Sequence, residues 1–370
     1  MQRTLVVILQ QRVHDHAKWP VELAEFQQLV KAAGLDEVDC IMQTRIRAHA
    51  GFLFGRGKVR ELAQRVADDG IEVVAVYNML TSMQKYNLQH ALGCQVLDRY
   101  EVVLQVFEME ARDRVSKLQL QLAWLQKSFP FIKVGERERL LKERPARRGG
   151  RGPGEYAYHA QLHQVRKRIA KVTTEIEKLR QENRRRLRKR RKLGMPMICL
   201  VGCYNAGKTS LFNALTGADK EVSDRPFTTL ASKWSRSANP SMLLVDTIGF
   251  ALGLDPELIS AFQLNLDDMR AADLLLLVVD AADDIILLQM KLESSLAILN
   301  ATGIDEERVI AVLNKADLAG DRLQEEVVPF FVENHDFTWV AASALTSWNL
   351  EELIERIRQR YLELGPVSHS

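Results

Sequence analysis

The 370-residue sequence has no uninterrupted apolar run near the roughly 18 residues that a membrane-spanning helix needs. Its first apolar stretch, residues 4–9, is too short for the hydrophobic region of a secretory signal, and no small-residue cleavage site follows it. Cysteine is scarce, and the four cysteines form neither a C-x-x-C pair nor a disulfide framework. We therefore expect a cytoplasmic protein with reduced thiols that binds no membrane.

The net charge of +3 conceals an uneven distribution of charge along the chain. Residues 1–110 carry 12 basic and 14 acidic side chains, and residues 196–370 carry 13 and 26. Residues 111–195 carry 26 basic and 8 acidic side chains, which is a net charge of +18. A segment this basic between two acidic ones predicts a polyanionic partner for the middle of the chain.

Strand and helix patterns alternate over residues 1–110 and predict a small α/β domain there. Apolar runs predict strands, and helical spacing that ends at glycine predicts helices. These predicted elements cover residues 4–9, 21–33, 57–67, 71–76 and 82–92.

Residues 111–195 predict a basic helical hairpin that links two other domains. Helical spacing runs from about Tyr100 to Ser128, and Pro130 and then Pro145 are expected to interrupt it. A glycine-rich loop at 147–155 separates it from a second helical pattern at 162–193. Two long helices joined by a loop favour an antiparallel hairpin.

The second helix ends in a tract, residues 184–192, in which eight of the nine side chains are basic. Such a tract is often only a solvated charged face, but the +18 charge of the whole segment favours binding to a phosphate backbone. The glycines of the 147–155 loop would permit a close approach to folded RNA. No apolar face with Trp or Phe accompanies the tract, which argues against membrane binding.

Residues 196–370 predict a third domain with a mainly parallel sheet, so the fold class of the whole chain is α/β. Nearly continuous apolar runs separated by helical patterns predict its strands. These runs lie at 197–201, 242–245, 274–280 and 309–313.

A phosphate loop follows the first of these strands. The spacing of Gly202, Gly207, Lys208 and Thr209 fits G-x-x-x-x-G-K-[ST], with a strand before it and a helix after it. Backbone amides of such a loop bind phosphate oxygens, the lysine reaches the β- and γ-phosphates, and the threonine hydroxyl binds Mg²⁺. The residues expected at the nucleotide are Gly202, Cys203, Tyr204, Asn205, Ala206, Gly207, Lys208, Thr209 and Ser210.

Three further motifs follow in the order that a GTPase domain requires. The first, Asp246-Thr247-Ile248-Gly249, supplies a carboxylate for Mg²⁺ and, at Gly249, an amide for the γ-phosphate. The second, Asn314-Lys315-Ala316-Asp317, places a carboxylate where it can accept hydrogen bonds from N1 and N2 of guanine, which adenine cannot donate. In the third, Ser343-Ala344-Leu345, a backbone amide can meet guanine O6, and Lys315 can lie along the base.

The loop Pro226-Phe227-Thr228-Thr229-Leu230 lies between the phosphate loop and Asp246, and it supplies a candidate ligand for the Mg²⁺ ion. We expect Thr229 to join Thr209 and Asp246 as a metal ligand and to contact the γ-phosphate. Thr228 is the alternative ligand, and a threonine-rich loop without a ligand role is the other reading. We name residues 218–231 switch I and residues 246–262 switch II.

We expect Lys208, Thr229 and Gly249 to take part in catalysis, and two further residues bear on it. Phe250 stands where Ras-type GTPases have the glutamine that orients the attacking water, so we expect slow intrinsic hydrolysis. Asn205 could help to coordinate K⁺ beside the phosphates, where the ion would offset developing charge. The competing interpretation, that Asn205 only stabilises the loop, is about equally supported.

The chain resembles the HflX family of the Obg-HflX group of translational GTPases over about residues 50–350. Beyond the GTPase motifs, the resemblance rests on four stretches. These are Gly51–Val59 (GFLFGRGKV), Ala91–Arg99 (ALGCQVLDR), Gly149–Glu155 (GGRGPGE), and Asp246–Phe250 with Ala261-Phe262.

The resemblance implies a GTPase that binds the large (50S) ribosomal subunit and its rRNA and separates stalled or idle ribosomes into subunits. It also implies GTP, GDP and Mg²⁺ as ligands, stimulation of hydrolysis by the ribosome, and a secondary use of ATP. Off the ribosome we expect a monomer. The chain departs from the family's pattern at Cys203-Tyr204, at Tyr156-Ala157 and at Ala231–Trp234, where the family usually has an acidic residue, proline and threonines.

Two other hypotheses compete with a ribosomal GTPase. One is an RNA-binding or RNA-remodelling protein that uses GTP only as a switch. The other is a signalling module in which the hairpin is a coiled coil that binds protein. The basic charge of residues 111–195 favours the two hypotheses that involve RNA.

Overall fold

A computed structural model describes residues 2–11, 18–143, 153–219, 226–227, 229–237, 241–253, 258, 262–335 and 338–366. The chain divides into two compact units. Unit 1 comprises Met1–Met109 with Lys117–Glu177, and unit 2 comprises Glu110–Ser116 with Lys178–Ser370. The sequence-based division into domains at 1–110, 111–195 and 196–370 stays a prediction. Among the described residues, no helix is long and apolar enough to cross a membrane.

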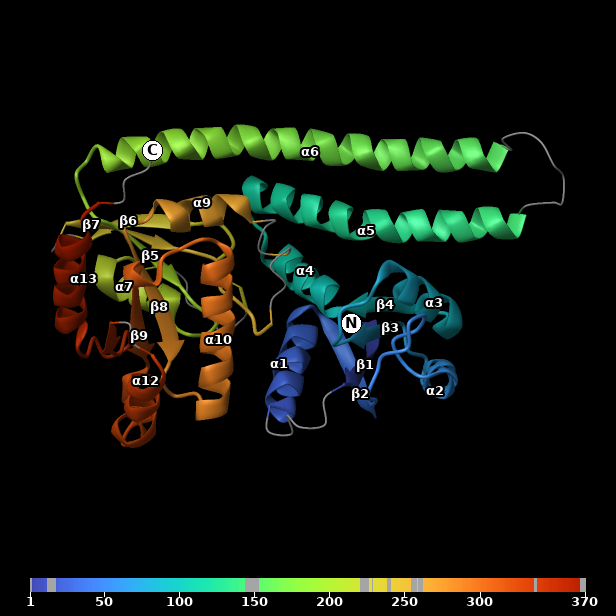
Figure 1. Cartoon of the computed structure of the whole chain (residues 1–370), viewed down its shortest axis with the longest axis horizontal. Helices are drawn as coiled ribbons and strands as arrows, with labels where there is room; N and C mark the ends of the chain where they lie inside the picture. The colour runs from blue at the N-terminus through green and yellow to red at the C-terminus, as the bar shows by residue number, and fades with distance from the viewer. Residues whose placement is uncertain are drawn as a thin grey trace. The chain divides into compact units, whose positions relative to one another are not determined.

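Unit 1 contains a four-stranded parallel sheet with the strand order β2-β1-β3-β4 (Figure 1). Its strands are β1 (Gln2–Gln10), β2 (Leu35–Thr44), β3 (Val73–Val76) and β4 (Gln95–Asp98). Its helices are α1 (Trp19–Ala32), α2 (Arg56–Asp68), α3 (Ser82–Leu92) and α4 (Arg99–Glu110). Alternate residues of the central strand, such as Leu5, Val7 and Leu9, enter one buried cluster with α2 and α3.

The stretch Gly51–Val59 forms a tight loop before α2 and the start of that helix. His49 and Leu53 pair across the loop, and Leu53 adopts the left-handed conformation with φ 65°. A Cβ atom on Gly55 would lie 2.2 Å from the guanidinium group of Arg45, so a larger residue there would displace the end of that side chain.

The stretch Ala91–Arg99 ends in buried charges at the carboxyl end of β4. Asp98 is fully buried, and its carboxylate accepts a hydrogen bond from the Leu80 amide at 3.3 Å and from Lys127 Nζ at 2.5 Å. Arg99 pairs with Glu25 at 2.8 Å and lies over the ring of Tyr77. Because an unpaired buried charge is costly, these partners explain how charged residues stand inside unit 1.

The two long helices predicted for the middle of the chain are α5 (Arg114–Glu143) and α6 (Pro153–Arg191) (Figure 1). The predicted interruption at Pro130 is wrong, because α5 runs through this residue. Pro130 and Gln126 are both exposed, so water can satisfy the carbonyl group that loses its helical partner. The break lies instead before Arg114, where Asp113 accepts hydrogen bonds from the amide and hydroxyl of Ser116. Pro145 and residues 147–152 lie outside the described residues. The predicted loop is wrong at residues 153–155, which form the start of α6.

Unit 2 contains a six-stranded sheet with the strand order β10-β9-β8-β5-β7-β6, in which β6 alone runs antiparallel. The strands predicted from apolar runs are β5 (Met197–Val201), β7 (Met242–Asp246), β8 (Leu274–Asp280) and β9 (Val309–Asn314). The sheet is completed by β6 (Lys233–Ser237) and β10 (Trp339–Ala341).

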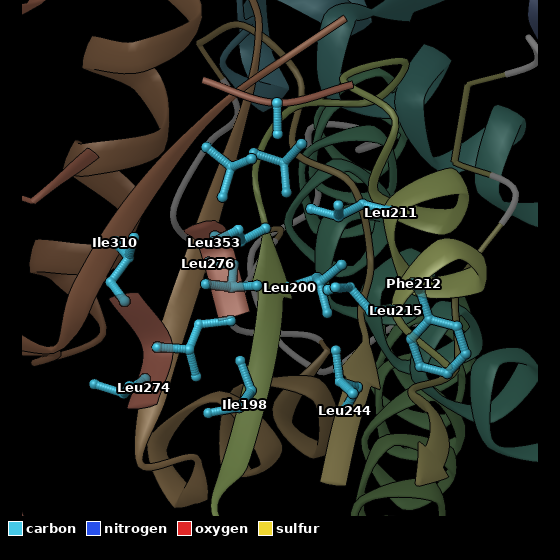
Figure 2. Close-up of a cluster of buried hydrophobic side chains, with 14 of the residues drawn as sticks. Ile198, Leu200, Leu211, Phe212, Leu215, Leu244, Leu274, Leu276, Ile310 and Leu353 are labelled. Atoms are coloured by element: carbon cyan, nitrogen blue, oxygen red, sulfur yellow. The ribbon is translucent and has the colours of Figure 1, made fainter. Parts of the chain in front are cut away.

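One face of this sheet is covered by α7 (Lys208–Thr216) and α13 (Leu350–Leu364) (Figure 2). Leu211, Phe212 and Leu215 of α7 and Leu353 of α13 pack on strand residues such as Leu200. The intervening strand residues point to the other face, where α9 (Gln263–Ala271) contacts β5 and α10 (Ile285–Ala301) contacts β8. The remaining elements are η1 (Glu306–Arg308), α11 (Ala316–Ala319), η2 (Leu323–Val327) and α12 (Val328–Asn334).

Candidate functional site

The phosphate loop lies between β5 and α7, at the carboxyl edge of the parallel strands, where ligands of such sheets bind. Its two glycines are required by close backbone packing. A Cβ atom on Gly202 would lie 2.3 Å from the carbonyl oxygen of Val278, and one on Gly207 would lie 2.2 Å from Asn314 Nδ2. Both glycines have positive φ angles, 131° and 89°. The loop can therefore present its amides only with glycine at these positions.

Lys208 is buried within the loop. Its Nζ donates hydrogen bonds to the carbonyl oxygens of Gly202 at 3.0 Å and Cys203 at 2.8 Å. Burial lowers the pKa of Lys208 to about 8, and the negative charge of Asp246 opposes this shift. These two hydrogen bonds hold the ammonium group against the loop. An anion bound there would raise the pKa of Lys208 back toward its usual value.

Two hydroxyl groups meet one oxygen of Asp246, which is fully buried at the end of β7. Thr209 Oγ1 donates to Asp246 Oδ2 at 3.1 Å, and Thr229 Oγ1 donates to the same atom at 3.2 Å. The structure thus brings all three predicted metal ligands together. No group of three His, Cys, Asp or Glu side chains suited to a metal occurs among the described residues.

The start of switch II runs beside the phosphate loop as a short parallel bridge between Cys203 and Phe250. The Phe250 amide donates to the Gly202 carbonyl at 3.0 Å, and the Tyr204 amide donates to the Phe250 carbonyl at 2.8 Å. A Cβ atom on Gly249 would lie 3.0 Å from Lys208 Nζ, so the Gly249 backbone passes directly over the lysine. The Phe250 side chain is buried and has no polar atom with which to orient a water molecule.

Thr247 and Ile248 support this path. The Thr247 hydroxyl donates to the Leu200 carbonyl at 2.7 Å, which ties switch II to β5, and Ile248 is buried. On the switch I side, Phe227 has a φ angle of 63°, and its ring lies 5.3 Å from that of Tyr204. Both rings are buried, as is Leu230, whereas Thr228 lies outside the described residues.

The predicted base-reading loops are joined to the phosphate loop by Asn314. Its Nδ2 donates to the Ala206 carbonyl at 2.8 Å, and its Oδ1 accepts from the Ala344 amide at 3.0 Å. Ser343 is fully buried, and its hydroxyl accepts from the Thr346 amide. Asp317 and Leu345 are both exposed. This exposure suits a carboxylate at Asp317 and a backbone amide at Leu345 that bind a base.

Several predicted residues lie at the rim of this site. Asn205 is exposed and adopts the left-handed conformation with φ 61°, which asparagine tolerates better than most residues. Ser210 is half-buried in the first turn of α7. Lys315 also has a positive φ angle, and its ammonium group pairs with Asp280 at 2.6 Å.

Sequence reasoning missed two residues that support the site. Asp280 ends β8 and fixes Lys315, and its place after an apolar strand, like that of Asp246, was a usable signal. Asn265 of α9 donates to the Leu230 carbonyl in switch I at 2.9 Å, and no local spacing reveals this contact.

Family models match three consecutive parts of the chain. "GTP-binding GTPase N-terminal" matches residues 21–108, "GTP-binding GTPase Middle Region" matches 110–191, and "50S ribosome-binding GTPase" matches 197–315. The GTPase HflX of Thermococcus kodakarensis is 32% identical over 348 residues, which cover 92% of this chain and 78% of that protein. The chain belongs to the HflX family of GTPases.

Other HflX relatives show similar identity. The protein of Thermofilum pendens is 34% identical, with 90% of this chain and 78% of that protein covered. The Escherichia coli protein is 32% identical, with 81% and 70% covered. A solved structure of a GTP-binding protein from Sulfolobus solfataricus in complex with GDP is 25% identical and covers 99% of this chain and 100% of that one, with a TM-score of 0.46. As an HflX protein, the chain binds guanine nucleotides and hydrolyses GTP, so the sequence-based prediction of a GTPase is confirmed.

Proposed function

We propose that this HflX protein is a cytoplasmic GTPase, monomeric off the ribosome, that binds the large ribosomal subunit and separates stalled or idle ribosomes. The observation that carries this proposal is the match of residues 197–315 to a family described as 50S ribosome-binding GTPases. The net charge of +18 over residues 111–195 supports it, because ribosomal RNA is a polyanion.

In this proposal the phosphate loop binds the phosphates of GTP. The amides of residues 203–210 surround the β-phosphate, and Lys208 exchanges its two carbonyl partners for phosphate oxygens. The Gly249 amide senses the γ-phosphate, which is consistent with the passage of its backbone over Lys208. Loss of this phosphate on hydrolysis would release both switches.

Thr209, Thr229 and Asp246 would hold Mg²⁺. Both threonine hydroxyls lie within hydrogen-bond distance of the same Asp246 oxygen, and hard oxygen ligands are those that Mg²⁺ prefers. When bound, the ion would supply positive charge that offsets the charge of the phosphates. Thr229 is favoured over Thr228 because its hydroxyl already meets the Asp246 carboxylate.

Guanine would be read by Asp317 and by the backbone after Ser343. Asn314 holds the two base-reading loops against the phosphate loop, so a base bound to Asp317 keeps a fixed distance from Lys208. Because the Ala344 amide is already bonded to Asn314, the Leu345 amide is the better candidate for guanine O6. A carboxylate in this role selects GTP over ATP.

Phe250 is buried and has no polar atom to orient water, so intrinsic hydrolysis would be slow and the ribosome would stimulate it. Asn205 is the candidate ligand of a K⁺ ion beside the phosphates. Its exposure suits that role, although its positive φ angle gives asparagine a backbone reason to stand there as well.

Part of the basic tract supports binding to RNA phosphate. Arg190 lies over the ring of Trp234 at 3.9 Å, and Arg191 donates to the Ala271 carbonyl, so both are engaged within unit 2. The other basic side chains of the tract are exposed. They are Arg184, Arg185, Arg186, Arg188, Lys189 and Lys192.

The test is sedimentation through a sucrose gradient with purified 50S subunits and a non-hydrolysable GTP analogue. Co-migration that depends on the analogue and weakens with salt supports the proposal. Binding to protein-free RNA without binding to subunits would favour the alternative, an RNA-binding protein that uses GTP as a switch. A following assay with intact 70S ribosomes tests splitting, because accumulation of free subunits requires it.

A further inference from the structure

Helix α9, which begins just after switch II, is bonded to switch I by one buried side chain. Asn265 is 2% exposed, and its Nδ2 donates to the Leu230 carbonyl at 2.9 Å. Leu230 follows Thr229 directly, and the Thr229 hydroxyl meets the Asp246 carboxylate. The donor on α9 thus fixes the peptide that carries the proposed magnesium ligand.

The same helix is bonded to the last turns of α6. Asp267 forms a two-point ion pair with Arg180, with Nε to Oδ2 at 2.8 Å and Nη2 to Oδ1 at 2.9 Å. Asn183 Nδ2 donates to Asp268 Oδ1 at 2.8 Å. Two-point arginine–carboxylate pairs fix orientation as well as distance. The position of α9 along its axis and its rotation about that axis are therefore both fixed.

Apolar and cation–π contacts complete this attachment of α6 residues 178–191. Leu187 is buried in a small cluster with Met197, Leu243 and Ala271. Arg190 lies over Trp234, which stands on β6 four residues after Leu230. The end of α6 therefore contacts both the helix that follows switch II and the strand that follows switch I.

We propose that Asn265 is a positioning residue for Thr229, and that Arg180 and Asn183 keep its helix in the register at which the Leu230 carbonyl can be bonded. The proposal rests on the proposed role of Thr229 as a Mg²⁺ ligand in the GTP-bound state. In this proposal, α6 residues 178–191 help to position switch I. This effect does not depend on any contact that the exposed arginines of α6 make.

The bond from Asn265 to the Leu230 carbonyl favours the GTP-bound state over the GDP-bound state. A switch I threonine binds metal and γ-phosphate when GTP is bound and loses that partner after hydrolysis. An immobilised Leu230 carbonyl reduces the ordering that GTP must impose on switch I, so it favours GTP over GDP. Deletion of the donor removes this advantage and also leaves a buried carbonyl without its partner.

The test substitutes Asn265→Leu, which keeps the size of the side chain but carries no hydrogen-bond donor, and uses Gln263→Ala on the same helix as the control. Affinities for GDP and for a non-hydrolysable GTP analogue are measured with Mg²⁺ and with EDTA. We expect the affinity for the analogue with Mg²⁺ to fall about tenfold, the value of one lost buried hydrogen bond. GDP affinity and the control should change less than twofold. Equal loss for both nucleotides, or no loss for either, overturns the proposal.

A second pair of variants tests the α6 side. Arg180→Ala and Asn183→Ala should each reduce the preference for the GTP analogue by about threefold, and their effects should not add to that of Asn265→Leu. Full additivity would show that α6 acts independently of Asn265, and it would overturn the proposed role of Arg180 and Asn183. Thr229→Ala in the same titration distinguishes failure of the proposed role of Thr229 from failure of the role of Asn265. If this variant keeps the Mg²⁺-dependent affinity, the role of Thr229 fails.

Discussion

Asn314 and Ala206 join the base-reading and phosphate-binding parts of the site through one hydrogen bond of 2.8 Å between Nδ2 and a carbonyl oxygen. The other end of the same amide accepts from Ala344, so a single side chain spans three loops. Asn314 is fully enclosed, and no other orientation of its amide would satisfy both partners.

Substitution of this residue should loosen all three loops at once. Asn314→Ala removes both bonds and leaves a buried carbonyl and a half-buried amide without this partner, at a cost of about 2–4 kcal/mol in the free energy of unfolding. The affinities for GTP and GDP should fall together, by tenfold or more. Chemical denaturation and nucleotide titration measure these effects, with Asn300→Ala on exposed α10 surface as the control. A variant with native stability and affinity would show that the loops are held by other contacts.

Asp317→Asn should change the base that the site prefers. The substitution exchanges an acceptor for a donor, so guanine loses its partner for N1 and N2 whereas xanthine, with an oxygen at position 2, gains one. We expect the affinity for GTP to fall at least a hundredfold and the affinity for XTP to rise. Competition binding with both nucleotides checks this, and retained affinity for GTP contradicts the role of Asp317.

Asn205 should make hydrolysis depend on the monovalent cation. If its amide oxygen helps to bind K⁺, GTP turnover in KCl should exceed turnover in NaCl at the same ionic strength, and Asn205→Ala should remove the difference. Asn205→Gly is the control for the backbone, because glycine accepts the positive φ angle at this position. Equal rates in the two salts for the unaltered protein would leave Asn205 with a role in loop conformation alone.

The exposed part of the basic tract should determine the salt dependence of RNA binding. Arg184 and Arg188 are both exposed and lie one turn apart on α6, so their replacement by glutamine removes two charges without disturbing the contacts of Arg190 and Arg191. The slope of log K against log salt for 50S subunits should fall by about 2 if each side chain meets a phosphate. The matched control is Arg356→Gln with Arg358→Gln on exposed α13, for which the slope should not change.

Asp268 should contribute a pH-dependent term to stability. Burial raises its pKa, and the hydrogen bond from Asn183 and the charge of Arg190 oppose the shift, whereas Asp267 adds to it. The buried thiol of Cys199 also faces this carboxyl group. Because the folded pKa lies above the unfolded pKa of about 4, the unfolded chain loses its proton first as pH rises, and stability falls through that window.

Asp268→Asn removes this titration. The free energy of unfolding of the variant, relative to that of the unaltered protein, should therefore increase with pH between the unfolded and folded pKa values and then remain constant. Urea denaturation between pH 4 and pH 8 measures the difference. A difference that decreases with pH would mean that the ionised carboxylate stabilises the fold.

Local patterns in the sequence predicted the parts of the structure that depend on local interactions. The apolar runs at 197–201 and 274–280 are β5 and β8, and the motif between Gly202 and Thr209 lies between a strand and a helix as expected. The strand β2 escaped prediction because it stands at a sheet edge and carries Asp36, Glu37 and Asp39 among its apolar residues.

Long-range contacts explain most of what the sequence could not indicate. β4 has four residues, and polar β6 is an edge strand, so neither has a distinctive period. The continuation of α5 through Pro130 depends on exposure of that turn, and the bonds of Asn265 and Asp280 depend on chain segments 35 residues away. The basic tract looked uniform, but tertiary packing divides it into exposed and engaged side chains.

The most direct test of the account is GTP turnover measured with and without purified 50S subunits, for the unaltered protein and for Lys208→Ala. We predict slow turnover alone, at least tenfold stimulation by subunits, and no turnover by the variant in either condition. Turnover that subunits do not change, in a protein that binds GTP, would contradict the claim that the large ribosomal subunit is the partner of this GTPase.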